Sequence, residues 1–135
     1  MGKETLAKRA FAKVKKKSLS WWIKKADAIF SRFIRQRDKG QCFTCPYKNE
    51  PKKLQNGHFC PRQHMATRFD ERNCNAQCFA CNMFYGGRPD AYALNLQKKF
   101  GEGIIKELHD QARTIKHWTI PELQDLIKKY ESVVI

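Results

Sequence analysis

The chain has 135 residues and a formal net charge of +14. This length suits one domain with one modest core and leaves no room for a second full domain. The excess of Lys and Arg predicts attraction to a polyanion, for which nucleic acid is the first candidate. No apolar spanning run, lipidation motif or secretory signal is visible, so we expect a cytoplasmic protein without membrane contact.

The chain is expected to divide into a basic N-terminal arm, residues 1–19, and one domain, residues 20–135. The arm contains the run KETLAKRAFAKVKKK, which fits either a solvated tail or a segment that follows phosphates. The two interpretations are compatible, because a free arm can become ordered on DNA. The candidate DNA contacts of the arm are Lys15, Lys16 and Lys17.

Helical spacing of apolar residues follows over residues 21–36, with Ser20 as the predicted N-cap. The apolar stripe is more typical of a buried core than of a base-stacking platform. Lys24 and Arg35 lie off this stripe, so they are candidate DNA contacts. The stripe consists of Leu19, Trp22, Ile23, Ala26, Phe30, Phe33 and Ile34.

The centre of the chain, residues 38–90, is rich in turns and contains all six cysteines. Further on, Thr119 and Glu122 form a predicted capping box, with Pro121 in the first turn of a final helix. The other expected elements are strands at 54–59 and 75–79 and helices at 90–100 and 102–113. Together they predict an α+β protein with a basic N-terminal helix and C-terminal helices around a small centre.

Four cysteines form two Cys-x-x-Cys pairs, CFTC and CFAC. In a reducing compartment this pattern indicates metal ligands more often than disulfides or a redox site. Four thiolates make a closed tetrahedral site, so the predicted ion is a structural Zn²⁺. The predicted ligands are Cys42, Cys45, Cys78 and Cys81. Cys60 and Cys74 remain, and we interpret them as small buried residues that could replace a ligand.

The zinc site has no need of His58, which ends the first predicted strand. A neutral imidazole can take a proton from water, and the amide oxygen of Asn82 can bind a hard divalent cation. Arg62 and Arg68 can hold phosphates. Together these groups could hydrolyse a phosphodiester with one metal ion. The alternative is that His58 is a structural residue with its hydrogen bonds satisfied.

Between Ser31 and Gly101 the pieces SRFIRQRD, CFTC, GHF, TRFDERN, AQCFACN and AYALNLQKKFG occur in order. With these pieces the chain resembles the NinG/Rap family of phage recombination endonucleases, and more widely the His-Me finger (HNH-type) nucleases. The resemblance implies a ββα-metal core with a Cys₄ structural zinc. It also implies cutting of branched DNA, such as Holliday junctions and D-loops, with Mg²⁺ or Mn²⁺.

The resemblance also implies roles for single residues. His58 matches the general base, and Asn73 matches the central asparagine that steadies the loop and the histidine. Asn82 matches the final motif position, a ligand of the catalytic metal.

The chain departs from the family pattern at Gly57, where many relatives carry a second metal ligand, Asp or His. The missing oxygen could come from Asp70, which we favour, from Asn56 or from the phosphate. His64 matches no motif position and is expected to be a surface or DNA-contacting residue.

The sequence thus predicts a Mg²⁺-dependent endodeoxyribonuclease that reads DNA shape, because no recognition-helix motif for base readout is visible. Cutting both strands of a junction symmetrically requires two active sites, so a homodimer is expected. The alternatives are a non-catalytic zinc protein that binds DNA, an HNH nickase that acts on linear duplex, and an RNA-binding zinc-knuckle protein.

Overall fold

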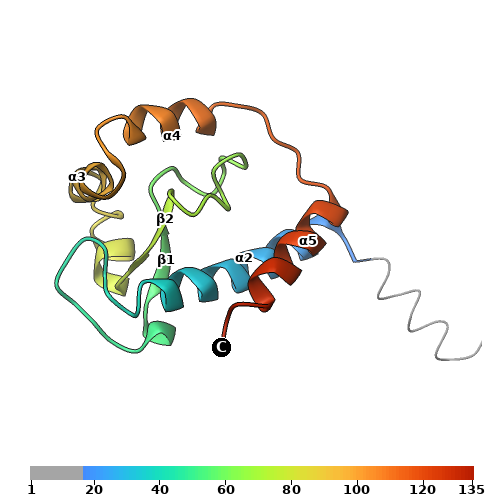
Figure 1. Cartoon of the computed structure of the whole chain (residues 1–135), viewed down its shortest axis with the longest axis horizontal. Helices are drawn as coiled ribbons and strands as arrows, with labels where there is room; N and C mark the ends of the chain where they lie inside the picture. The colour runs from blue at the N-terminus through green and yellow to red at the C-terminus, as the bar shows by residue number, and fades with distance from the viewer. Residues whose placement is uncertain (1–16) are drawn as a thin grey trace, which may run out of the picture.

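The computed structural model describes residues 17–135, so Lys15 and Lys16 lie outside the described residues. Two strands lie between the α2–α5 helix pair and helices α3 and α4 (Figure 1). The elements are α2 (Leu19–Arg37), η1 (Pro51–Lys53), β1 (Gln55–His58), β2 (Cys74–Gln77), η2 (Ala80–Phe84), α3 (Pro89–Phe100), α4 (Ile104–Ala112) and α5 (Ile120–Glu131). The described chain is therefore a small α+β protein, as expected.

Helix α2 begins earlier than the sequence predicts. Ser18, not Ser20, is its N-cap, and its hydroxyl accepts a hydrogen bond from the Trp21 N–H at 3.2 Å. The Ser20 hydroxyl lies inside the first turn, 3.1 Å from that of Ser18. The predicted apolar stripe is confirmed for Ala26, Phe30 and Ile34, which are buried, whereas Leu19 is exposed. Leu19 is exposed because it opens the helix, beyond the reach of the core.

The sheet has two antiparallel strands, in which His58 pairs with Cys74 and Gly57 with Asn75. Both strands are shorter than predicted. All of β2 is buried. Cys74 packs in a core cluster with Phe30 of α2, and the side-chain amide of Asn75 donates to the Tyr92 hydroxyl of α3 at 3.1 Å. Within residues 17–135 the outer edge of β1 pairs with no strand, which leaves that edge open beside His58.

Helix α5 packs along α2 (Figure 1). Its capping box is present as predicted, with the Thr119 hydroxyl accepting from the Glu122 N–H and the Glu122 carboxylate accepting from the Thr119 N–H. Leu123 and Ile127 of α5 join Phe30 of α2 in one core cluster. This cluster also includes Phe69 and Cys74, so it joins α2 both to α5 and to the sheet.

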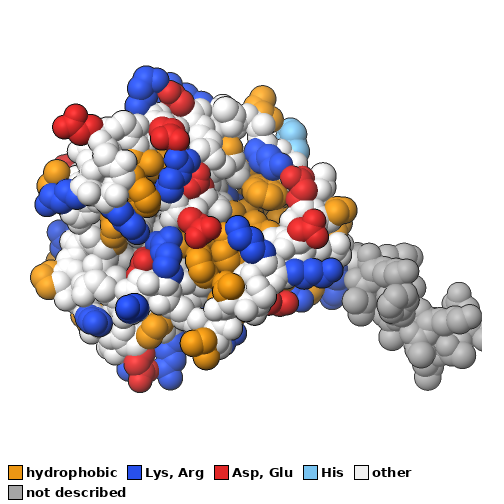
Figure 2. Space-filling view, viewed as in Figure 1, with side chains coloured by type: hydrophobic (Ala, Val, Ile, Leu, Met, Phe, Trp, Pro, Cys, Tyr) orange, Lys and Arg blue, Asp and Glu red, His pale blue; other side chains and the backbone are white. Residues whose placement is uncertain are grey.

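Helices α3 and α4 cover the other side of the sheet around a second core cluster, which includes Tyr92, Leu96 and Leu108. On the face shown in Figure 2, Lys and Arg side chains are spread among Asp and Glu rather than gathered in one patch. None of the helices among residues 17–135 combines the length and the apolar character that crossing a membrane requires.

Candidate functional site

The four predicted zinc ligands come together in the structure. One pair follows α2 and the other joins β2 to η2, and the four sulfur atoms all lie within 4.8 Å of one another. The Sγ atoms of Cys45 and Cys78 are 3.7 Å apart. A tetrahedral zinc with Zn–S bonds of about 2.3 Å places its sulfurs about 3.8 Å apart. The cluster therefore fits a structural zinc ion.

N–H groups already point at these sulfurs. The Cys78 N–H donates to Cys42 Sγ at 3.3 Å, and the Arg88 guanidinium donates to Cys81 Sγ at 3.1 Å. Burial acts to raise the pKa of Cys42, but hydrogen bonds from Cys78 and Thr44 outweigh it and lower the pKa to about 7. Such donors stabilise the thiolate of Cys42, the form that binds zinc. Burial instead raises the pKa of Cys45 to about 12 and also raises the pKa of Cys78, so these two thiols would lose their protons on binding the ion.

The remaining cysteines, Cys60 and Cys74, are buried outside the cluster, as predicted. All six cysteines lie within the described residues, and all six are free thiols. The disulfide alternative is therefore not observed.

A hollow of about 870 Å³ lies beside the open edge of β1. It brings together five residues named from the sequence, Asn56, His58, Arg62, Arg68 and Asn82, and adds Asp27 of α2. Residues from distant parts of the chain thus share one site.

His58 is held in a defined orientation at the end of β1. Its Nε2 lies 3.0 Å from the carbonyl oxygen of Arg68. A carbonyl only accepts, so Nε2 carries the proton and Nδ1 is the nitrogen free to accept one. Burial is the main cause that lowers the pKa of His58, against smaller raising effects of the Arg68 carbonyl and the Asp27 carboxylate. The neutral imidazole is therefore favoured at neutral pH.

Asn82 is oriented by β1 and by the cysteine cluster. Its Nδ2 donates to Gln55 Oε1 at 2.7 Å, and its backbone N–H donates to the Cys78 carbonyl at 3.0 Å. This leaves Oδ1 of Asn82 as the atom available to a ligand in the hollow. Because Asn82 directly follows Cys81, a metal ion in the cysteine cluster would also fix the position of this amide.

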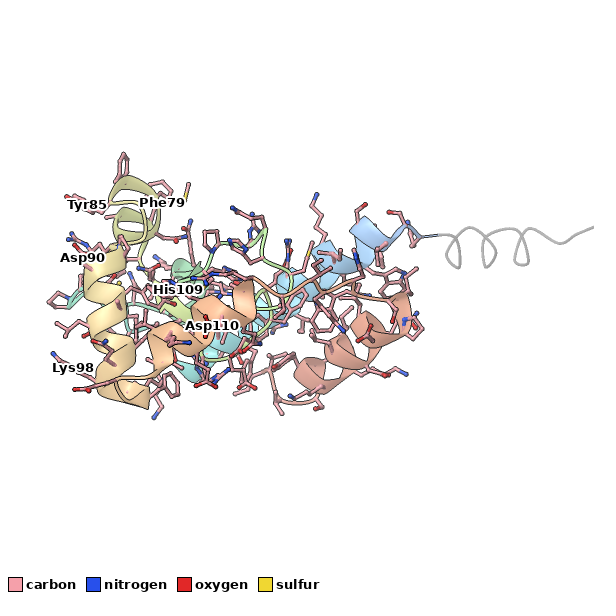
Figure 3. All side chains as sticks on the ribbon, turned by 90° about the horizontal axis from the view of Figure 1, so that it is seen from above. Phe79, Tyr85, Asp90, Lys98, His109 and Asp110 are labelled. Atoms are coloured by element: carbon pink, nitrogen blue, oxygen red, sulfur yellow. The ribbon has the colours of Figure 1, made fainter. Side chains whose placement is uncertain are left out.

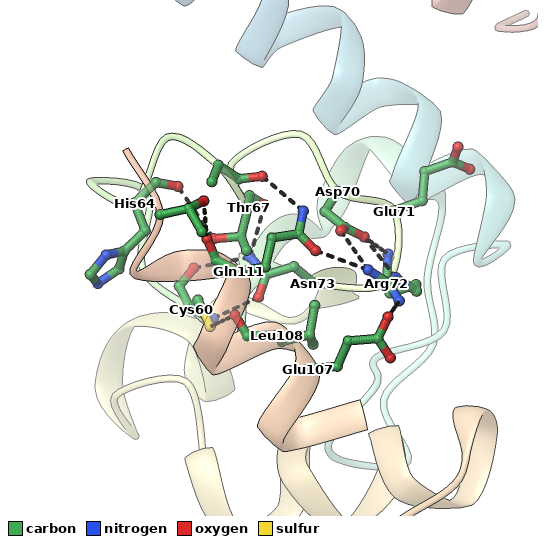
Figure 4. A network of polar contacts seen from close by, with 12 residues as sticks. Cys60, His64, Thr67, Asp70, Glu71, Arg72, Asn73, Glu107, Leu108 and Gln111 are labelled. Carbon is green, nitrogen blue, oxygen red and sulfur yellow. Dashed lines mark hydrogen bonds and ion pairs between the residues drawn. The ribbon is translucent and has the colours of Figure 1, made fainter. Parts of the chain in front are cut away.

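Asn73 does not reach the hollow but holds the loop beside it. Its side chain is fully buried, with Oδ1 accepting from the Cys60 N–H at 2.7 Å. Its Nδ2 donates to the carbonyls of Cys60 and Thr67 at 3.0 and 3.1 Å (Figure 4). Asn73 therefore ties together the two ends of the loop that carries Arg62 and leads to Arg68.

The structure does not place Asp70 in the hollow. Both of its carboxylate oxygens bond Arg72, whose guanidinium also contacts Glu107 (Figure 4). Burial acts to raise the pKa of Asp70, but the hydrogen bonds from Arg72 outweigh it and lower the pKa. The sequence favours Asp70 as the second metal ligand, but in the structure its carboxylate is paired with Arg72.

Asn56 does line the hollow, and its Oδ1 is buried without a hydrogen-bond partner among the described residues. Gly57 has no room for a side chain, because a Cβ there would lie 1.9 Å from Gln77 Oε1. Of the two side chains considered for the missing oxygen, Asn56 is the one at the hollow.

The predicted cationic contacts are divided among different places. Arg62 lines the hollow, and Lys24 lines an adjoining hollow beside Trp21. Arg68 lines both, but its guanidinium pairs with the Asp27 carboxylate, so it is not a free phosphate clamp. Arg35 lies elsewhere, where it contacts the carbonyls of Ser31 and Pro51.

Two further predicted residues lie outside the hollow. Lys17, the first described residue, places its ammonium 5.2 Å from the centre of the Trp21 ring. The His64 imidazole points away from the polar network around Asn73 (Figure 4) and does not line the hollow.

Asp27 and Gln55 were not predicted from the sequence, although both bond residues of the site. Asp27 borders the apolar stripe of α2, four residues after Ile23, and Gln55 lies in a short strand, so neither belongs to a motif. The signal for Asp27 in the sequence is a carboxylate at helical spacing from the apolar residues Ile23 and Phe30.

Fold and site together define a small α+β protein with a four-cysteine zinc-type cluster beside a polar hollow. The family profile described as "NinG: Bacteriophage Lambda NinG protein" matches residues 2–134. The chain belongs to the NinG family. Similar relatives named "Protein ninG" come from Escherichia phage 933W, with 31% identity over 85% of this chain, and from Escherichia phage lambda, with 30% identity over 85%.

The chain spans little more than half the length of these curated relatives, 57% of the 933W protein and 56% of the lambda protein. A third relative named "Protein ninG", from Salmonella phage P22, is 30% identical over 85% of this chain and 57% of its own length. No solved structure matches the chain.

Proposed function

We propose that this protein is an endodeoxyribonuclease that cuts branched DNA by metal-dependent hydrolysis, with His58 as the general base. The observation that carries the proposal is the pairing of His58 and Asn82 at one hollow. Each uses one side-chain atom for a fixed protein contact and leaves a reactive atom free, Nδ1 of His58 and Oδ1 of Asn82.

The proposed core is a ββα-metal unit of the His-Me finger type, made of β1, β2 and η2. In this unit β1 supplies His58 and η2 supplies Asn82. The zinc cluster would act as a scaffold, because four cysteine ligands leave no open position for water. The catalytic groups would then come entirely from the hollow.

In the proposed reaction His58 Nδ1 removes a proton from a water molecule, which attacks phosphorus in line with the leaving 3′ oxygen. Asn82 Oδ1 would hold Mg²⁺ or Mn²⁺, which when bound neutralises charge on the phosphate and leaving oxygen. Arg62 would contact a neighbouring phosphate. The products are a 3′ hydroxyl and a 5′ phosphate.

Asp27 and Arg68 hold His58 in position. The Asp27 carboxylate holds the Arg68 guanidinium, and the Arg68 carbonyl holds the His58 ring. We therefore assign Arg68 a positioning role through its backbone, in place of the phosphate-clamping role expected from the sequence. Arg62 and Lys24 remain the cations available to DNA phosphates beside the site.

Branched DNA is the proposed substrate because the chain carries the NinG family pattern and its basic charge offers sequence-independent attraction to phosphates. Symmetric cutting of a four-way junction requires two active sites, so we propose that the protein acts as a homodimer on this substrate. Sedimentation of the protein with and without a junction tests this assembly.

The direct test is cleavage of an end-labelled four-way junction and of its matched linear duplex, with Mg²⁺ and without it. Wild type should cut the junction only with Mg²⁺, and His58→Ala should lose about 10²- to 10⁴-fold in rate, the usual contribution of a positioned base. His64→Ala is the matched control, because His64 lies outside the hollow. Tight junction binding without cutting under any divalent ion would instead indicate a non-catalytic zinc protein.

A further inference from the structure

Four large apolar side chains project from η2 and its flanks into solvent. Figure 3 shows Phe79 and Tyr85 at one end of the molecule, pointing outward. The exposed fractions are 52% for Phe79, 59% for Met83, 77% for Phe84 and 57% for Tyr85. Side chains of this kind are normally buried, and a contiguous exposed group of them marks an interaction site. We call these four residues the η2 patch.

Contacts among neighbouring residues hold the aromatic side chains of the η2 patch in place. The rings of Phe79 and Phe84 meet edge to face with centroids 5.4 Å apart. The Arg88 guanidinium lies 4.1 Å from the centre of the Tyr85 ring while its Nε donates to Cys81 Sγ. The cysteine cluster therefore fixes a surface of aromatic faces accompanied by one cation.

The η2 patch is continuous with the candidate active site. Met83 lines the same hollow as His58 and Asn82, and so do Gly86 and Gly87, which follow Tyr85. A polymer with one phosphate in the hollow would thus run on past Phe84 and Tyr85. The occupant of the patch is then the same molecule that occupies the hollow.

We infer that the η2 patch stacks against bases that are unpaired or unstacked at the branch point of DNA. This inference rests on the proposed function and names the part of the substrate that is read. Intact duplex hides its base faces, whereas a branch point can offer them to aromatic side chains and to an arginine. The Arg88 guanidinium beside Tyr85 and the continuity of the η2 patch with the hollow favour a nucleic acid over a second copy of the chain at this surface.

The test compares wild type with the double variant Phe84→Ala/Tyr85→Ala. Phe100→Ala is the control, because Phe100 is another exposed aromatic residue, at the end of α3 and outside the η2 patch. Binding is measured without Mg²⁺, by anisotropy, on a junction and on its matched duplex. The junction carries 2-aminopurine at the branch point, whose fluorescence reports a change in stacking.

We expect the double variant to bind the junction at least about tenfold more weakly, because each base–aromatic stack contributes substantially to affinity. Its affinity for duplex should stay within about threefold, and the 2-aminopurine change seen with wild type should disappear. The control should behave as wild type. Unchanged zinc content and circular dichroism would show that the double variant is folded.

Junction binding and 2-aminopurine signals equal to those of wild type would overturn the inference. So would a loss of affinity that is equal for junction and duplex, or a shift from dimer to monomer that accounts for the loss. Because these measurements need no cleavage, they are separate from the nuclease test. If the double variant loses stacking and wild type cuts no DNA, the η2 patch binds bases but the protein is not a nuclease. If wild type cuts the junction and the double variant keeps the 2-aminopurine signal, the protein is a nuclease but the η2 patch does not bind bases.

Discussion

His58 depends on residues that lie far from it in the chain. The Arg68 carbonyl sets its tautomer, and the Asp27 carboxylate holds the Arg68 side chain. Burial removes water from the imidazole and lowers its pKa from the ordinary value of 6.5. A general base must be unprotonated, so in the proposed reaction this shift would favour cleavage at neutral and mildly acidic pH.

The acid limb of the cleavage rate should therefore lie below pH 6.5, the ordinary pKa of histidine. Cleavage falls only as the pH drops through the lowered pKa of His58. Asp27→Asn removes a negative charge that raises this pKa, so it should move the limb to still lower pH. Single-turnover rates between about pH 5 and pH 8 measure both effects. An acid limb above pH 6.5 in wild type would contradict the assignment of His58 as base.

Asn73→Ala should destabilise the fold, because it leaves the Cys60 N–H and the carbonyls of Cys60 and Thr67 without their partner. Each buried unsatisfied group costs about 1–3 kcal/mol. Urea unfolding of the zinc-loaded protein measures the loss. Gln63→Ala, a change at an exposed residue of the same loop, should stay within about 0.5 kcal/mol of wild type. Equal stability of the two variants would mean that Asn73 does not hold the loop.

Residue types and motif spacing singled out His58, Asn82 and the four clustered cysteines as candidates, because these positions stand in short local patterns. Asp70 shows the limit of that approach. The sequence favours it as the second metal ligand, yet the fold pairs its carboxylate with Arg72, which also contacts Glu107 of α4. Partners from distant elements cannot be read from spacing.

At the scale of elements, the cysteine cluster joins the end of α2 to the junction of β2 and η2. η2 is a short π-type turn that holds Cys81 and Asn82 together. Two consecutive glycines after it have positive φ, +58° for Gly86 and +84° for Gly87. This conformation lets the chain turn back so that Arg88 reaches the Cys81 sulfur. The local geometry of Asn82 thus depends on the cluster.

Cys78→Ser should abolish zinc binding and unfold the centre of the domain, because a structural zinc contributes directly to folding. Zinc content per chain and near-ultraviolet circular dichroism test this expectation. Cys60→Ala is the matched control, since Cys60 is buried outside the cluster, and it should keep one zinc per chain. A Cys78→Ser protein that keeps its zinc and fold would rule out the four-cysteine site.

At the scale of the whole molecule, the positions of Lys and Arg side chains decide where DNA phosphates can bind, independently of any sequence motif. Lys24 and Arg62 line adjoining hollows, whereas Arg35 lies away from both. Cations beside the hollows should contact phosphates and release counterions on binding. The distribution of cations therefore predicts which substitutions change the salt dependence.

Lys24→Gln and Arg62→Gln should each reduce the slope of log K against log salt concentration by about 1. Arg35→Gln should leave the slope unchanged, because Arg35 contacts backbone carbonyls of its own protein. Titrations of a junction at several salt concentrations provide the slopes. An equal effect of all three changes would indicate that DNA covers the Arg35 side as well.

The sequence by itself determined the α+β class, the four cysteines of the zinc-type cluster, the capping box of α5 and the candidate pair His58 and Asn82. These depend on local periodicity, on residue chemistry and on short spacings. Only the tertiary structure decided that Asp27 holds Arg68, that Asp70 lies outside the hollow and that the η2 patch adjoins it. The physical reason is that such contacts join segments far apart in the chain, and packing of the helices on the two strands sets their geometry.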